Sequence, residues 1–135
     1  MSERALRLTL ILAGAYLLLT GLLALLAPGT FFDEIGRYGV ENSHYVGDVG
    51  AFLAAAGFGL LLAVNRPAWR APLLCVGAAW FALHALNHLF DIGEARSDAR
   101  GAFDTLALAL GAAGSIYLAQ VSERLRRADP GGAGP

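Results

Sequence analysis

Sulfur is almost absent from this 135-residue chain, which has one cysteine and one methionine. The lone Cys75 excludes an internal disulfide and any metal or redox motif built on two cysteines. The only methionine is Met1, so a thioether site for Cu(I) is disfavoured as well. Lysine is missing altogether, because all ten basic residues are arginines. Any ligand chemistry must therefore come from nitrogen and oxygen groups.

Charge is scarce too. Charged residues make up 16% of the chain, against about a quarter in a typical soluble domain. The net charge of −1 gives no basic patch, so we expect no nucleic-acid partner. What the sequence does contain is 56% hydrophobic residues, with 17 glycines mixed among alanine and leucine. This composition is typical of closely packed helices whose partner is the lipid bilayer.

Four apolar runs are each long enough to cross a hydrocarbon core of about 30 Å at 1.5 Å per residue. They predict an all-α fold, an antiparallel four-helix transmembrane bundle with helices at about 6–27, 44–65, 69–91 and 102–123. We expect one domain over residues 1–127 and a disordered tail at 128–135. The first run is longer than the apolar region of a typical cleaved signal peptide, so we expect an uncleaved helix that stops at Pro28 and Gly29. Residues 30–43 and 92–100 are predicted loops.

The arginines predict the orientation of the bundle. Seven of the ten lie near the N-terminus, in the 65–70 turn or in the tail. By the positive-inside rule, this side of the multi-pass protein is cytoplasmic and holds both termini. The other side then receives all three histidines and eight of the eleven acidic residues.

The histidines carry the sharpest functional signal. His84, His88 and Asp91 follow the spacing i, i+4, i+7, which places them on one face of the third helix, with Asn87 beside it. On the second helix, His44 precedes Asp48 by four residues.

A stripe of small residues four apart predicts the face of the second helix that packs inward: Gly47, Ala51, Ala55 and Gly59. Because His44 and Asp48 lie beside this stripe, we expect them to point into the bundle. A similar stripe on the fourth helix follows Asp104 and contains Ala107, Gly111, Ser115 and Ala119.

Imidazole and carboxylate groups together suit a divalent Zn, Mn or Fe ion bound between helices. The candidate metal ligands, which we expect near the outer face, are His44, Asp48, His84, His88 and Asp91. Asn87 and Asp104 are expected to hydrogen-bond to these ligands. Haem and quinone are less favoured than a metal ion, because they would leave the acidic residues without a role. A quinone would need an apolar slot with Trp80 and Phe81 as its walls.

Two other interpretations remain open. The same groups could relay protons without a metal. They could also be a structural polar cluster in a non-enzymatic subunit or scaffold, which packs against itself as a homo-oligomer or joins a larger membrane complex.

Short motifs carry a resemblance to a known group. The first helix ends in Leu-Ala-Pro-Gly-Thr-Phe-Phe, the second opens with His-Tyr-Val-Gly-Asp-Val-Gly-Ala-Phe from His44 to Phe52, and the third ends in the histidine pair. In these features the chain resembles the DoxX-like superfamily of small bacterial four-helix membrane proteins. The resemblance implies a compact antiparallel bundle, and named members are tied to thiosulfate:quinone oxidoreduction and membrane redox complexes. Here the single Cys75 offers no thiol pair for sulfur chemistry.

Overall fold

A computed structural model describes residues 1–128, and this part of the chain is helical without strands. The long helices are α1 (Glu3–Leu26), α3 (Ser43–Ala63), α4 (Pro67–Phe90) and α5 (Asp98–Ala128). Each is long and apolar enough to cross a membrane, as the sequence predicted. Between them lie the short α2 (Pro28–Glu34) and a 3-10 turn, η1 (Ile92–Glu94).

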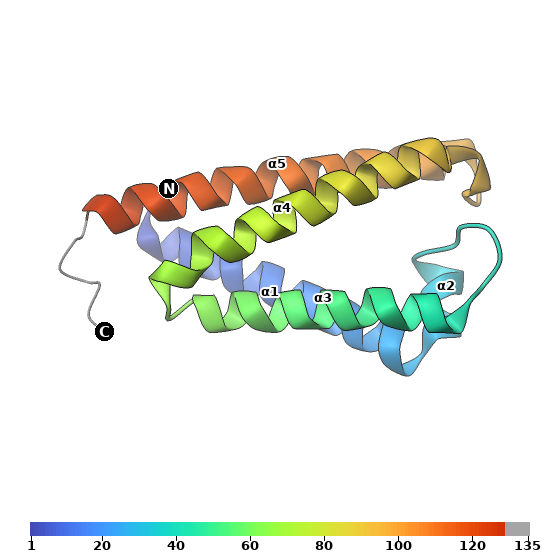
Figure 1. Ribbon diagram of the computed structural model, residues 1–135, viewed down its shortest axis with the longest axis horizontal. Helices are drawn as coiled ribbons and strands as arrows, with labels where there is room; N and C mark the ends of the chain where they lie inside the picture. Colours follow the sequence, from blue (N-terminus) through green and yellow to red (C-terminus); the bar gives the residue numbers. More distant parts are fainter. Residues whose placement is uncertain (129–135) are drawn as a thin grey trace.

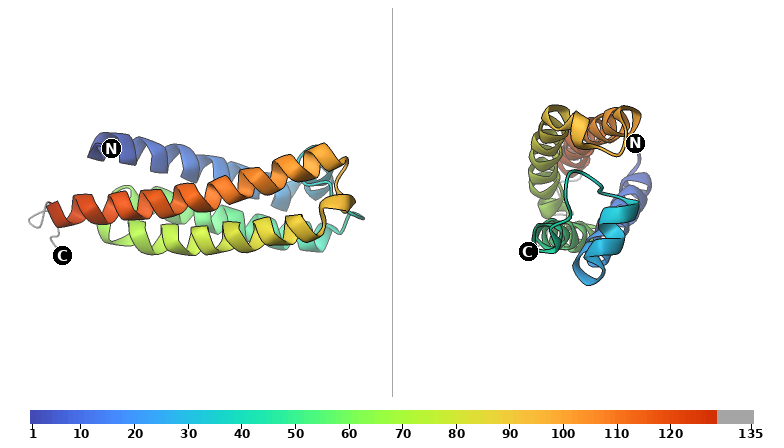
Figure 2. Two further views of the ribbon diagram at one scale, coloured as in Figure 1. Left: turned by 90° about the horizontal axis from the view of Figure 1, so that it is seen from above. Right: turned by 90° about the vertical axis from the view of Figure 1, so that its right-hand side faces the viewer.

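The long helices form two pairs. Most contacts between helices lie within α1–α3 and within α4–α5, and far fewer join one pair to the other. The pairs are visible in the end-on view (Figure 2). Successive long helices lead back and forth, so that α1 begins and α5 ends at one end of the molecule (Figure 1). We call this the terminal end and the opposite one the α2 end.

Glycines set the packing of α1 on α3. A Cβ added to Gly21 would collide with the backbone of Ala54, and one added to Gly57 would collide with the backbone of Leu18. Such close approach of two helix backbones requires residues without a side chain.

The predicted stripe on the second helix was therefore wrong in phase. A Cβ on Gly47 would meet nothing within 4 Å, and Ala51 and Ala55 are exposed. The inward face of α3 instead carries Gly50 and Gly57, seven residues apart. On α5 the predicted stripe is right only in its later part, since Ala119 is buried and Ala107 is exposed.

The apolar core joins the two pairs at the terminal end. It contains Leu6, Leu10, Leu60, Val64, Ala71, Leu74, Ala119 and Val121. Beside it, the guanidinium of Arg70 is 2% exposed and donates two hydrogen bonds to the carboxylate of Glu3, at 2.8 and 3.0 Å. It also donates to the carbonyl oxygens of Ala63 and Val64, which the end of α3 leaves free.

Several predicted boundaries shift. As predicted, α1 stops before Pro28. Residues 28–34, however, form helix α2, which has proline at its first position and buries its own Phe31 and Phe32 side chains. The helix α5 begins at Asp98, inside the predicted loop, and includes Ala128. The rest of the predicted disordered tail lies outside the described residues. Cys75 is exposed.

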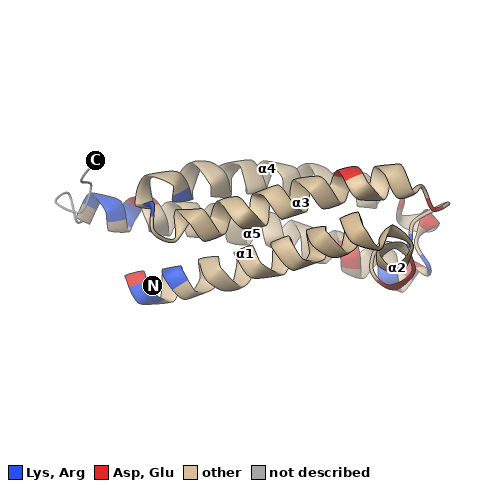
Figure 3. Ribbon diagram, turned by 90° about the horizontal axis from the view of Figure 1, so that it is seen from below, with Lys and Arg blue, Asp and Glu red and all other residues tan. Residues whose placement is uncertain are grey.

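Charged residues gather towards the two ends of the molecule and leave the middle of the helices uncharged (Figure 3). This distribution is typical of helices whose central parts face hydrocarbon. The polar groups of interest lie at the α2 end, where the last turns of α4 meet the loop that follows α2.

Candidate functional site

A histidine pair lies in the last two turns of α4. The Nε2 atoms of His84 and His88 are 2.9 Å apart, a distance at which one ring donates a hydrogen bond to the other. The spacing of four residues places the two rings one turn apart on one face, as predicted. Both side chains are half-buried.

Aromatic rings continue the pair in both directions. Towards the terminal end, the ring centroids of His84 and Trp80 are 4.7 Å apart, and Trp80 stacks on Phe52 of α3 with a centroid distance of 5.0 Å. Towards the α2 end, the rings of His88 and Tyr38 pack edge to face, with their centroids 4.2 Å apart. The result is a continuous row of five rings that connects α3, α4 and the loop between α2 and α3.

Tyr38 connects the histidine pair to an acid. Its hydroxyl donates to Asp104 of α5 at 3.5 Å, and Asp104 accepts from Nε of Arg100 at 2.9 Å. Burial raises the pKa of Tyr38, and the neighbouring Asp104 carboxylate raises it further, because both disfavour a phenolate. The loop is anchored by the bond from the Gly39 amide to the Glu94 carbonyl.

Two of the predicted ligands lie elsewhere. His44 and Asp48 form a loose pair at 3.7 Å on the surface of α3, where their side chains are 81% and 66% exposed. The expectation that they point into the bundle was wrong, because Gly50 and Gly57 turn a different face of α3 inward.

The remaining acid among the candidate ligands is also separate. Asp91 is exposed and accepts a hydrogen bond from its neighbour Asn87 at 3.1 Å. Within residues 1–128, no three histidine, cysteine or acidic side chains converge on one point. The structure thus brings together the two histidines, with Asp104 linked to them through Tyr38, and leaves the other acids apart.

The two predicted walls of an apolar slot have different neighbours. Trp80 lies between Phe52 and His84, whereas Phe81 covers the position at which Gly111 of α5 would carry a side chain. Sequence reasoning missed Tyr38 and Phe52 as members of this row. Helical spacing gives no signal for a loop residue such as Tyr38, while Phe52 lies one turn after Asp48 and was within reach of the same argument.

Fold and site together define an all-helical chain with four helices able to span a membrane and a histidine pair near the end of one of them. The chain matches no protein-family model, no curated protein and no solved structure with which it was compared.

Proposed function

We propose that this chain is a multi-pass protein of a bacterial plasma membrane that binds a divalent Zn, Mn or Fe ion through His84 and His88. In this proposal the four long helices form an antiparallel bundle with both termini in the cytoplasm, and the histidines lie towards the outer face.

The distance between the two Nε2 atoms carries the proposal. Two nitrogens held about 2.0–2.1 Å from one ion lie about 2.8–3.4 Å apart, for ligand angles between 90° and tetrahedral. The observed 2.9 Å falls at the start of this range. Histidines four residues apart on one helix are a common source of two such ligands.

Asp48 is our candidate for a third ligand. Phe52 stacks on Trp80, and Asp48 and His84 each lie one turn further towards the α2 end. Asp48 is therefore expected at about the same level of the bundle as His84 on the neighbouring helix, and a role as ligand requires its exposed side chain to rotate away from His44.

Elemental analysis of the detergent-purified protein tests the proposal. We expect near-stoichiometric Zn, Mn or Fe in the wild type and its loss in His84→Ala and His88→Ala. His44→Ala is the matched control, since it removes the remaining histidine from an exposed position and should retain the ion. Metal that persists in both α4 variants, while they remain folded by circular dichroism, contradicts the proposal.

A visible spectrum of the same sample separates the other cofactors. Haem would give a Soret band, which we do not expect, because two histidines whose Nε2 atoms face each other at 2.9 Å leave no space for a porphyrin between them.

A structural role in a subunit or scaffold is the second candidate, and the row of rings favours it. Each histidine ring packs on two neighbouring rings, so the pair contributes to packing whether or not it binds an ion. Under this interpretation no metal is found, and His84→Ala lowers the melting temperature more than His44→Ala does.

A further inference from the structure

The segment between α2 and α3, residues 35–42, reaches across the α2 end and contacts the α4–α5 pair; we call it the strap. Within the strap, Tyr38 alone has a side chain that is not exposed, and its ring packs on His88. Val40, two residues later, is 93% exposed. The strap therefore docks on the α4–α5 pair through a single aromatic ring and not through an apolar core.

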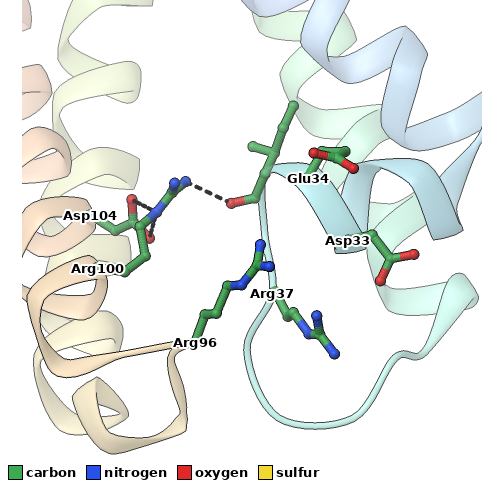
Figure 4. A pocket seen from close by; sticks show the side chains of 7 residues that line it. Asp33, Glu34, Arg37, Arg96, Arg100 and Asp104 are labelled. Carbon is green, nitrogen blue, oxygen red and sulfur yellow. Dashed lines mark hydrogen bonds and ion pairs between the residues drawn. The ribbon is translucent and has the colours of Figure 1, made fainter.

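Polar contacts hold the rest of the strap in place. The Gly39 amide donates to the backbone of η1 at 3.2 Å. The carbonyl oxygen of Ile35 accepts from Arg100 of α5 at 3.1 Å, and this arginine is paired with Asp104 at 2.9 Å (Figure 4). The Tyr38 hydroxyl donates to the same Asp104 at 3.5 Å. Asp104 thus holds the strap at two points, directly through Tyr38 and indirectly through Arg100.

The two ends of the molecule differ in how the helix pairs are joined. At the terminal end they share the apolar core and the buried guanidinium of Arg70. At the α2 end the strap contributes mainly polar contacts, and Gly36 and Gly39 flank the segment that carries Tyr38. The φ angle of Gly39 is +56°, in the left-handed region. Segments with few buried apolar contacts open at the lowest free-energy cost, and such glycines serve as hinges.

The closed strap leaves one polar atom without a partner. The Nδ1 atom of His88 is buried and forms no hydrogen bond within the part of the chain that the structure describes. A buried ring nitrogen without a partner destabilises the state that buries it, because water would satisfy the same atom. This cost offsets part of the stabilisation that the packing of Tyr38 on His88 provides.

We propose that the strap is a lid over the histidine pair and that the bond from Tyr38 to Asp104 is its latch. When this bond breaks, the strap moves about Gly36 and Gly39, lifts the ring of Tyr38 from His88 and admits water from the α2 end. The use of this movement to admit a metal ion rests on the proposed function, whereas the movement itself does not.

Modification of histidines by diethyl pyrocarbonate, followed at each residue by mass spectrometry, tests the proposal in detergent-purified, chelator-treated protein. His44, whose side chain is 81% exposed, supplies the reference rate in every sample, and we expect His88 to react more slowly than His44 in the wild type. Tyr38→Phe keeps the ring and removes the hydroxyl, so it should speed the reaction of His88 by about two- to tenfold, the effect of one hydrogen bond on an opening equilibrium. Tyr45→Phe is the matched control at an exposed tyrosine and should leave this rate unchanged.

Further variants separate a latch from simple packing. Asp104→Ala removes the acceptor of the Tyr38 hydroxyl and should speed the reaction of His88 at least as much as Tyr38→Phe, whereas Tyr38→Ala also removes the covering ring. If Tyr38→Ala speeds the reaction while Tyr38→Phe reacts like the wild type, the ring covers His88 by packing alone and the latch is overturned. A wild-type His88 that reacts as fast as His44 overturns the lid as well. Circular dichroism establishes that each variant is folded, and the chelator makes these rates independent of whether the histidines bind an ion.

Discussion

Single arginines at the terminal end have two roles. The sequence alone indicates only on which side of the membrane Arg7 and Arg70 lie. In the structure both arginines stabilise the turn between α3 and α4. Arg7 donates to the carbonyl oxygen of Val64 and to the side chain of Asn65. Arg70 donates both to the Val64 carbonyl at the end of α3 and to the Glu3 carboxylate. A count of charges predicts on which side of a membrane an arginine lies, but it carries no information about what the guanidinium contacts.

Replacement of Arg70 by alanine should lower the free energy of unfolding by about 2–4 kcal/mol, because it leaves buried carbonyl oxygens and the Glu3 carboxylate without donors. Arg66→Ala is the matched control from the same turn. Arg66 is exposed and its guanidinium rests over Trp69, a contact worth about 0.5–1 kcal/mol. Thermal unfolding in detergent measures both, and equal melting temperatures would contradict the role given to Arg70.

Among the candidate site residues, the sequence predicted those within one helix and failed across helices. His84 and His88 are neighbours because four residues make about one turn, whatever the rest of the chain does. The position of Asp48 instead depends on which face of α3 packs on α1, and two glycine patterns competed for that face. Tyr38 reaches His88 from a loop, and loop paths do not follow from periodicity.

At the scale of helices, the pairing of α1 with α3 depends on glycine. The small-residue stripe predicted on α3 repeats every four residues. The contacts between α1 and α3 instead use Gly50 and Gly57 on α3 and Gly14 and Gly21 on α1, and each pair is seven residues apart. Both spacings keep glycines on one side of a helix. Only the backbone of the neighbouring helix decides between them.

Alanine at Gly21 or Gly57 should therefore destabilise the protein by about 1–3 kcal/mol, since the added methyl group meets backbone atoms that cannot move aside. Gly77→Ala should be neutral or stabilising by up to about 1 kcal/mol, because its Cβ has open space and alanine favours the helix. Unfolding in a denaturing detergent compares the three variants. A Gly77→Ala variant as unstable as Gly57→Ala would contradict the proposed close packing.

At the scale of the whole molecule, the number of long helices and their approximate bounds followed from the sequence. Apolar runs and the charges that interrupt them report directly on length and hydrophobicity. The short helix α2 did not follow, because seven residues give too little periodicity to separate a helix from a loop. The division into two helix pairs also depends on contacts between distant residues.

The proposed orientation can be measured with single cysteines. In a Cys75→Ser background, Ser2→Cys places a thiol at the terminal end and Ser97→Cys places one at the α2 end. We expect a membrane-impermeant maleimide to label Ser97→Cys in intact spheroplasts and Ser2→Cys only after lysis. The reverse pattern would invert the bundle and place the histidines towards the cytoplasm.

The length of α5 has a further consequence. Its 31 residues extend about 46 Å, some 16 Å more than the hydrocarbon core of a typical bilayer. A helix that crosses upright then carries about five residues at each end into the headgroup layers, which puts Arg100 at the level of the lipid phosphates. A thicker bilayer draws these ends towards hydrocarbon, and a thinner one favours tilt. Because α4 packs along α5, we expect such a tilt to move His84 and His88 relative to α3, so that the geometry of the histidine pair depends on membrane thickness.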